Sequence, residues 1–161
     1  MDPKETTALG FRRALIPLDG SIVAEAILPS FLRLARPLGI EVVLVRIVPA
    51  AQSTALEDVR HAGENIERVR EEAVEYLRAV AATPLFEGLH AVTSVRTGEA
   101  AVEILAAAKE FHVDLIAMTT HGRTGLRRLL FGSVAEAVLR AAHVPVVIVR
   151  ATEAEMARRV A

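Results

Sequence analysis

Five short apolar runs, rich in leucine and β-branched residues, alternate along the chain with longer segments in which apolar positions recur at helical spacing. Such runs are typical of buried strands, and such segments are typical of amphipathic helices. The predicted strands are residues 13–18, 40–48, 91–96, 114–118 and 144–149, and the predicted helices are residues 21–36, 56–82, 97–111 and a last one from residue 133. Strands joined by such long connections form a parallel sheet, so the sequence predicts a doubly wound α/β fold with helices on both faces.

Local signals refine the first and last predicted helices. Pro29 lies inside the first helix and predicts a kink, whereas Pro37 and Gly39 predict where this helix ends. Ser133 predicts the N-cap of the last helix. Glu136 follows three residues later and completes a predicted capping box.

A glycine-containing basic segment follows the fourth predicted strand. Residues 119–125 read Thr-Thr-His-Gly-Arg-Thr-Gly, and Gly132 and Ser133 then open the last helix. Glycine lets the backbone approach an anion, and the first N–H groups of a helix point at it. The spacing fits neither the Walker A loop, which ends in Gly-Lys-Ser/Thr, nor the dinucleotide fingerprint, which follows the first strand. The segment is a candidate phosphate site of another kind.

Two interpretations of this segment stay open. In one, the N–H groups of Gly122, Gly132 and Ser133 bind nucleotide phosphates while arginines supply opposing charge, namely Arg123, Arg127 and Arg128. In the other, the glycines only turn the chain, Ser133 only caps the helix and the arginines are solvated. Ligands of doubly wound sheets bind beyond the carboxyl ends of the strands, so the position of the segment favours the nucleotide.

Other candidate residues also come at strand ends. Asp19, Ile47, residues 96–98 and residues 119–125 are therefore expected to converge on one rim. The Asp19 carboxylate can bind a ribose hydroxyl or help to hold Mg²⁺; the alternative is a turn residue that leads into the first helix. His121 can contact a phosphate, although a single histidine is more often structural.

Composition limits the remaining classes. The chain has 161 residues, of which 52% are hydrophobic, so one compact domain is expected. The net charge of -1 provides no overall attraction to nucleic acid, and the absence of cysteine excludes disulfides and thiolate metal sites. Neither a signal peptide nor a membrane-spanning stretch is recognisable, so we expect a cytoplasmic protein without a membrane partner.

Several stretches resemble the universal stress protein family in order and spacing, namely residues 15–21, 120–125, 130–136 and 143–149. The resemblance implies a universal stress protein domain at 12–150, an N-terminal extension at 1–11 and a C-terminal tail at 151–161. It implies a three-layer, Rossmann-like fold of the adenine nucleotide alpha hydrolase-like type, with five parallel strands in the order 3-2-1-4-5. A homodimer is also implied and, in one branch of the family, ATP bound at the strand ends.

Members of that branch share the pattern glycine, two residues, glycine, nine residues, glycine, then serine or threonine. Gly122, Gly132 and Ser133 match it, whereas Thr119 stands in place of the first glycine. The Thr119 side chain can crowd the ribose or a phosphate, or its hydroxyl can donate to one of them. The nucleotide contacts that the resemblance implies are Pro17, Leu18, Asp19, Ile47, Met118, Thr119, His121, Gly122, Arg123, Gly125, Gly132, Ser133 and Val134.

The last predicted strand is the expected dimer contact. Val146, Val147, Ile148 and Val149 are apolar on both faces and lie at a sheet edge in the strand order of the family. An exposed edge invites pairing, and pairing with a symmetry mate across a two-fold axis would bury it. The alternative is that residues 152–161 cover this edge.

These observations lead to one main hypothesis. We expect a dimeric stress-response sensor or adaptor that binds ATP, with or without Mg²⁺ at Asp19, and that presents a surface to an unidentified protein partner. The alternative is a nucleotide-independent dimeric stress protein whose function is carried by protein contacts. No nucleophile with an adjacent base and no paired carboxylates are recognisable, so we expect no enzyme activity beyond slow ATP hydrolysis.

Overall fold

Five parallel strands form one sheet in the order β3-β2-β1-β4-β5. The computed structural model describes residues 10–50, 58–121 and 132–151, although not the side chains of residues 58–64 and 121. The strands are β1 (Arg13–Pro17), β2 (Glu41–Val48), β3 (Ala91–Thr97), β4 (Leu115–His121) and β5 (Val146–Ala151). The predicted α/β class and the predicted strand order are confirmed.

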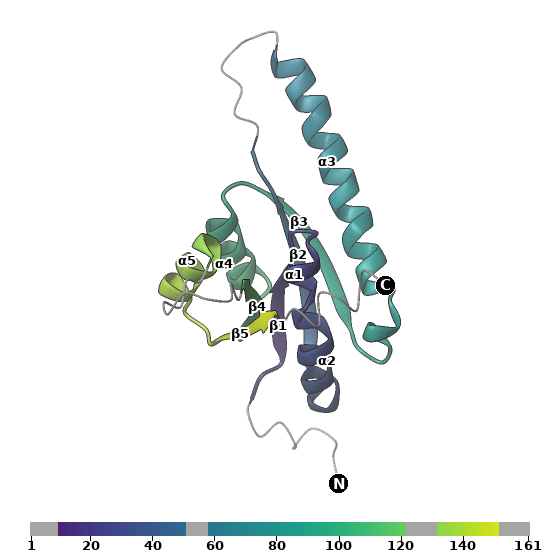
Figure 1. The fold of residues 1–161 in the computed structure, drawn as a ribbon, viewed down its shortest axis with the longest axis vertical. Helices are drawn as coiled ribbons and strands as arrows, with labels where there is room; N and C mark the ends of the chain where they lie inside the picture. The colour runs from purple at the N-terminus through teal and green to yellow at the C-terminus, as the bar shows by residue number, and fades with distance from the viewer. Residues whose placement is uncertain (1–9, 51–57, 122–131, 152–161) are drawn as a thin grey trace.

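Helices cover both faces of this sheet (Figure 1). They are α1 (Ile22–Glu25), α2 (Ile27–Leu38), α3 (Asp58–Ala81), the short 3-10 helix η1 (Pro84–Phe86), α4 (Ala100–Glu110) and α5 (Ser133–Ala141). Successive strand residues point to opposite faces, so Ile16 packs with Leu28 of α2 and Leu77 of α3. Its neighbour Leu15 packs with Ile104 of α4 on the other face. Two mainly aliphatic cores thus hold the three layers together.

The first predicted helix is divided into α1 and α2 at Ala26. Pro29 has no N–H for the Glu25 carbonyl, and its ring crowds that carbonyl, so the break comes shortly before the proline. The kink predicted from Pro29 thus corresponds to a break of the helix at Ala26. The prediction that Pro37 helps to end this helix is wrong, because Pro37 lies inside α2. Gly39 ends α2 with a left-handed φ of 64°.

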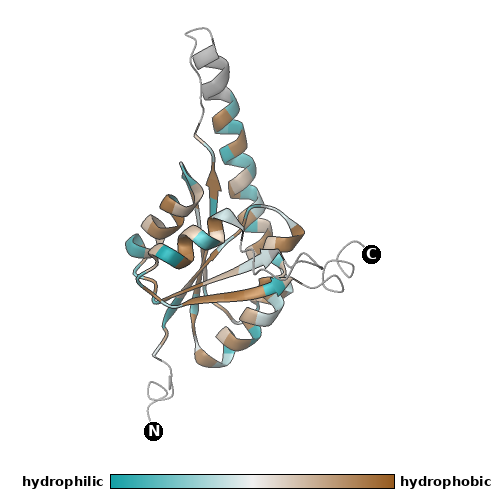
Figure 2. Cartoon of the chain, turned by 60° about the vertical axis from the view of Figure 1, so that its left-hand side comes forward, coloured by the Kyte–Doolittle hydropathy of each residue, from teal (hydrophilic) through white to brown (hydrophobic). Residues whose placement is uncertain are grey.

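The longest helix, α3, extends past the strands (Figure 1). It has 24 residues, close to the predicted range, and its C-terminal half packs on the sheet through Ala73 and Leu77, which are fully buried. Hydrophilic and hydrophobic residues alternate along the part of α3 that is coloured in Figure 2. The same helix therefore supplies a core face and a solvated face.

The last two strands run further toward their carboxyl ends than predicted. β4 continues beyond Met118 to His121, and β5 covers residues 146–151 instead of 144–149. In the parallel register, Thr119 pairs with Val149 and His121 pairs with Ala151. Threonine is β-branched and fits a strand, so the two threonines after Met118 prolong β4 instead of starting the loop.

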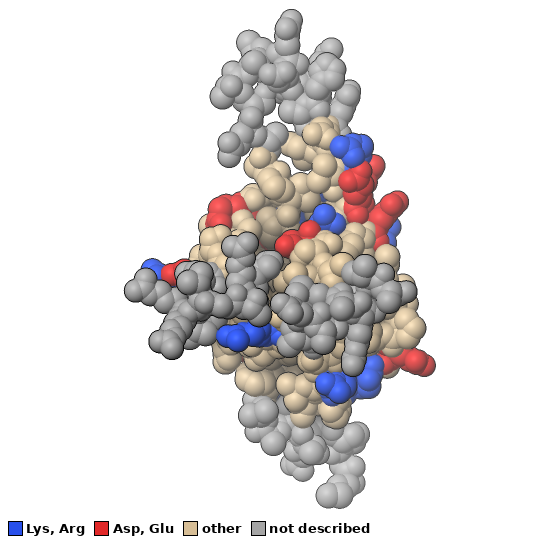
Figure 3. All heavy atoms as spheres, in the orientation of Figure 1, with Lys and Arg blue, Asp and Glu red and all other residues tan. Residues whose placement is uncertain are grey.

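Acidic and basic side chains are interspersed over the face of the molecule that Figure 3 shows. This mixing fits the net charge of -1. Within residues 10–50, 58–121 and 132–151, no helix combines the length and the apolarity that crossing a membrane requires.

Candidate functional site

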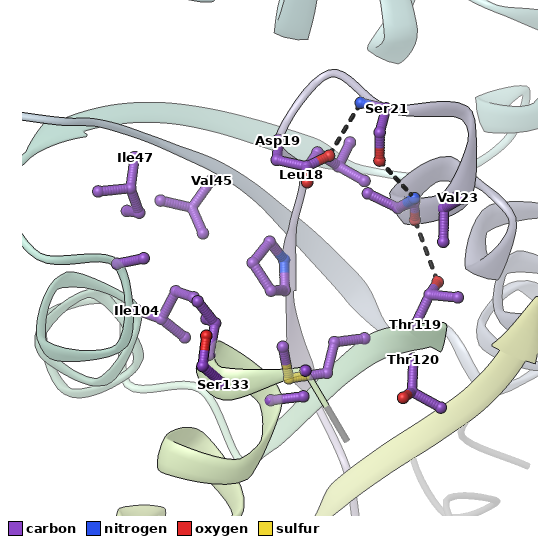
Figure 4. Close-up of a pocket in the computed structure, with 17 residues that line it drawn as sticks. Leu18, Asp19, Ser21, Val23, Val45, Ile47, Ile104, Thr119, Thr120 and Ser133 are labelled. Carbon is purple, nitrogen blue, oxygen red and sulfur yellow. Dashed lines mark hydrogen bonds between the residues drawn. The ribbon is translucent and has the colours of Figure 1, made fainter. Parts of the chain in front are cut away.

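A pocket of about 290 Å³ lies at the carboxyl ends of β1, β2 and β4, beside the N-terminus of α5 (Figure 4). β1 has β2 on one side and β4 on the other, which is where the strand order of this sheet reverses. The lining residues are Pro17, Leu18, Asp19, Ser21, Val23, Ala24, Val45, Ile47, Ala100, Ile104, Met118, Thr119, Thr120, Gly132, Ser133, Val134 and Ala135. The pocket thus occupies the place where ligands of doubly wound sheets bind.

Most of the predicted contact residues meet at this pocket, namely Pro17, Leu18, Asp19, Ile47, Met118, Thr119, Gly132, Ser133 and Val134. His121 ends β4, and its side chain is not described. Gly122, Arg123 and Gly125 lie outside the described residues. These nine residues therefore line one pocket, and their contact with a nucleotide stays a prediction.

Residues 96–98 lie at the predicted rim, because Arg96 and Thr97 pair in register with Ile47 and Val48 at the carboxyl end of β2. They are not among the residues that line the pocket. The Arg96 guanidinium donates to Glu103 at 2.8 Å and to Glu110 at 2.6 Å, so the side chain is held along α4. These ion pairs raise the pKa of Arg96 above its ordinary value, with the hydrogen bond to Glu103 as the largest cause.

Sequence reasoning missed the residues that close the inner part of the pocket, including Val45 and Ile104. Both are buried, as is Met118 beside them. Val45 was within reach of the sequence, because it lies two residues before Ile47 in one strand and therefore faces the same side. Ile104 was not, because its place depends on how α4 packs against the sheet. Together they make the inner wall apolar.

Asp19 stands at the mouth of the pocket, in the turn between β1 and α1. Its Oδ1 accepts a hydrogen bond from the Ser21 N–H at 2.8 Å, and the Ser21 Oγ accepts from the Ala24 N–H at 3.0 Å (Figure 4). Gly20 between them has a φ of 87°, which glycine adopts without strain. Asp19 is exposed, so a carboxylate oxygen stays available to a ligand while the other shapes the turn.

Thr119 lies within β4, not in a loop, and its side chain lines the pocket. The Thr119 Oγ1 donates a hydrogen bond to the Ala24 carbonyl of α1 at 3.2 Å (Figure 4). The hydroxyl is therefore engaged by the protein itself. Two roles were predicted for this side chain, namely crowding the ligand or donating a hydrogen bond to it. Donation to a ligand would require breaking the bond to Ala24.

Thr120 presents a second hydroxyl from the next position of β4. Its Oγ1 is buried and has no hydrogen-bond partner within the described part of the chain. Buried polar atoms in native proteins are nearly always paired. Thr120 also lines the pocket, so this hydroxyl lies beside the candidate site.

The N-terminus of α5 faces the pocket without a side-chain cap. The predicted capping box is wrong, because the N-cap is Gly132 and Ser133 is the first helical residue. Glu136 pairs with Arg140 instead of reaching back. An added Cβ at Gly132 would meet no atom of the described chain within 4 Å. Among the described residues no side chain caps the first N–H groups of α5, and uncapped N–H groups of this kind can bind an anion.

The charge of the described lining is small and negative. Asp19 is its one ionisable side chain. Within the described ranges, no group of three or more histidine, aspartate or glutamate residues is arranged to hold a metal ion. Among the described residues, the positive potential available to a phosphate comes from the dipole of α5.

Comparison with known proteins agrees with this architecture. A sequence profile of the Universal stress protein family matches residues 10–150. The universal stress protein MJ0531 of Methanocaldococcus jannaschii is 32% identical over 145 residues, which cover 90% of this chain and 85% of that protein.

Solved structures share the fold. The structure of MJ0577 from Methanocaldococcus jannaschii superposes with a TM-score of 0.74 at 25% identity and covers 89% of this chain and 98% of that one. A universal stress protein from Archaeoglobus fulgidus, described in complex with dAMP, has a TM-score of 0.54 at 24% identity, covering 86% and 97%. The profile match, the sequence relatives and the common strand order together show that the chain belongs to the universal stress protein family.

Proposed function

We propose that this protein binds ATP in the pocket and acts as a homodimeric sensor or adaptor in a stress response. One observation carries the proposal: a helix N-terminus that no described side chain caps borders an apolar pocket that has a carboxylate at its mouth. Such a site selects a ligand with three parts. The helix N-terminus favours an anionic group, the apolar pocket favours an apolar body, and the carboxylate favours a part that bears hydroxyls. A nucleotide combines all three.

The nucleoside part fits the inner pocket. Small-molecule pockets usually measure roughly 300–1,000 Å³, and this one, at about 290 Å³, suits a nucleoside better than a whole nucleoside triphosphate. Val45, Ile47 and Ile104 offer apolar contacts to a flat base. Asp19 at the mouth is placed to accept hydrogen bonds from ribose hydroxyls.

The phosphates would then lie at the exposed end of the pocket, against α5. Gly132 and Ser133 are both exposed there, and the space beside Gly132 is empty of protein atoms within the described chain. The Ser133 hydroxyl would add a donor to the backbone N–H groups. Arg123, outside the described residues, is the proposed source of counter-charge.

Mg²⁺ would bind mainly through the phosphates, with Asp19 as one oxygen ligand from the protein. We propose no rapid turnover, because binding phosphates at a helix N-terminus does not by itself position a water for attack. Slow hydrolysis would follow only from a water that reaches the terminal phosphate. The signalling state would then be set by nucleotide occupancy.

The proposed dimer forms through the outer edge of β5. In the described residues, β5 pairs only with β4, and Val146, Val147, Ile148 and Val149 are half-buried. Antiparallel pairing of two such edges would satisfy the outward backbone groups of both copies. An unidentified protein partner would bind the surface that this dimer presents.

Support from relatives is of a general kind. The Archaeoglobus fulgidus protein is described with dAMP, which is an adenine nucleotide. At 24% identity this likeness speaks for the fold alone, so the proposal rests on the pocket residues of this chain.

A second candidate is a nucleotide-independent dimer of the same fold. Thr119 favours it, because the side chain stands in the pocket wall and its hydroxyl is engaged by Ala24. Protein contacts would then carry the function without a ligand.

Two measurements distinguish these candidates. The first is native mass spectrometry of protein purified without added nucleotide, and the second is calorimetric titration with ATP and Mg²⁺, with GTP as the control for base selectivity. Saturable heat with ATP, or co-purified adenine nucleotide, is the expected result. A chain that carries no nucleotide and gives no heat with ATP overturns the proposal in favour of the second candidate.

A further inference from the structure

A cluster of polar side chains lies on the face of the sheet opposite the pocket, directly behind the turn that carries Asp19. It consists of Arg46 from β2, Tyr76 from α3 and Glu25 from α1. Val45 and Ile47, on either side of Arg46, line the pocket. Because strand residues alternate, Arg46 projects to the other face, where α3 packs.

Two contacts join the three side chains. The guanidinium carbon of Arg46 lies 4.9 Å from the centroid of the Tyr76 ring, within the range of a cation–π interaction. The Tyr76 hydroxyl donates to Glu25 Oε1 at 2.9 Å. Burial and then this hydrogen bond raise the pKa of Tyr76 above its ordinary value. The phenol is therefore held neutral, as a donor to the carboxylate.

The cluster also touches the turn itself. A Cβ added to Gly20 would lie 3.3 Å from both terminal nitrogens of Arg46, so the guanidinium fills the space that the missing side chain leaves. Gly20 stands between Asp19 and Ser21, the two turn residues that line the pocket. Arg46 therefore supports this turn from beneath.

We propose that Arg46 and Tyr76 are positioning residues that hold the Asp19–Ser21 turn and helix α1 in the geometry needed to bind the nucleoside part of the ligand. The inference rests on the proposed function. The two side chains touch no ligand. Arg46 acts through its contact with Gly20, and Tyr76 acts through its hydrogen bond to Glu25. In this way α3 stabilises the mouth of the pocket from the opposite face of the sheet.

The first test needs no ligand. The Ser21 amide is bonded to Asp19, and the Ala24 amide is bonded to Ser21, so the exchange rates of these two hydrogens report the order of the turn. In Tyr76→Phe and in Arg46→Leu, we expect both rates to rise by about fivefold relative to the wild type.

The control removes a different arginine, one that bonds to residues away from the pocket. Arg36 donates to the Glu87 and Leu85 carbonyls at 3.1 and 3.0 Å. Arg36→Leu should lower stability in urea without changing exchange at Ser21 and Ala24. If the control and the cluster variants change these amides equally, the cluster has only a general structural role and the inference is wrong.

The second test measures affinity for adenosine and for ATP by calorimetry. Both ligands should lose affinity by the same factor, about fivefold, in Tyr76→Phe and Arg46→Leu, because the turn contacts the nucleoside and not the phosphates. Unchanged affinity for both probes in variants that remain folded would overturn the inference. A wild type that binds neither probe would instead overturn the proposed function, and with it the claim on affinity.

A spectroscopic signature completes the test. Tyr76 is the single tyrosine of the chain. Protein made with fluorotyrosine therefore gives one fluorine NMR signal, which reports the cluster alone. Adding adenosine to the wild type should shift this signal, and Arg46→Leu should reduce the shift; binding without any shift would contradict the coupling.

Discussion

The Thr119 hydroxyl on β4 donates to the Ala24 carbonyl on α1 across 3.2 Å, although the two residues are 95 positions apart in sequence. Ala24 lies in α1, a single turn whose last carbonyls lack partners within the helix. Thr119 thus ties the end of a strand to the end of a helix. Thr119 stands where the ATP-binding pattern of the family has glycine. A glycine there would leave the backbone accessible to a ligand, whereas this chain has a side chain that bonds to Ala24.

Two substitutions at Thr119 separate its hydroxyl from its bulk. Thr119→Val keeps the shape but removes the hydrogen bond to the Ala24 carbonyl, so we expect the free energy of unfolding to fall by about 1 kcal/mol. Affinity for ATP should stay within about twofold of the wild type, because the hydroxyl serves Ala24. Thr119→Gly should be less stable but bind ATP about threefold more tightly, since it removes a side chain from the pocket wall.

Urea unfolding and calorimetry provide both measurements for these variants. Thr119→Ser, which retains the hydroxyl, is the control for stability. Loss of ATP binding in Thr119→Val would mean that the hydroxyl contacts the nucleotide after all.

Gly132→Ser tests the open helix N-terminus. Serine is a better N-cap than glycine, so the variant should be more stable by about 0.5 kcal/mol. Its hydroxyl would accept from the same N–H groups that the proposal assigns to phosphate, and its Cβ would enter the open space. ATP affinity should therefore fall at least about tenfold while adenosine affinity changes little. Equal losses for adenosine and ATP would place the phosphates elsewhere.

The proposed β5 dimer can be tested at the level of single backbone groups. The Pro145 carbonyl accepts from the Ile116 N–H at 3.0 Å, so Pro145 faces β4. Alternate residues face the same neighbour, which turns the Val147 N–H toward β4 and the Ile148 N–H outward. Ile148→Pro should give a folded monomer in sedimentation, because it removes only an outward donor.

Val147→Pro is the matched comparison, since it removes a donor within the chain. It should unfold at lower urea, with a free energy of unfolding about 2 kcal/mol below that of Ile148→Pro. A dimer that survives Ile148→Pro unchanged would exclude edge pairing at this strand.

The raised pKa of Tyr76 predicts how stability depends on alkaline pH. A tyrosine ordinarily titrates near 10. Burial first, and then the bond to Glu25, raise the pKa of Tyr76 in the folded state. This stabilisation is present below pH 10 and is lost as the pH rises further, because the unfolded chain then releases a proton that the folded chain retains.

Tyrosinate absorbance follows this titration directly, because no other tyrosine contributes. The signal should appear only as the protein unfolds, and Tyr76→Phe should lose stability less steeply above pH 10. A titration near pH 10 in the folded protein would show that the phenol is solvated.

Much of the fold was accessible from periodicity alone. Runs such as residues 42–45 bury every side chain between two helical layers, and α3 repeats apolar residues at helical spacing, so both patterns depend on local sequence. Element ends were less accessible. Thr119 and Thr120 look like a polar loop in sequence, yet pairing with β5 extends β4 through them.

The sequence by itself determined the layered α/β architecture, the strands that end near the pocket and the glycine and serine that face it, because repeated patterns and turn residues act locally. Tertiary structure alone decided that Gly132 rather than Ser133 caps α5, that Thr119 serves Ala24, and that Arg46 supports Gly20. Each of these depends on the separation of atoms from different elements. Differences of an ångström, which no residue pattern encodes, decide whether such groups bond.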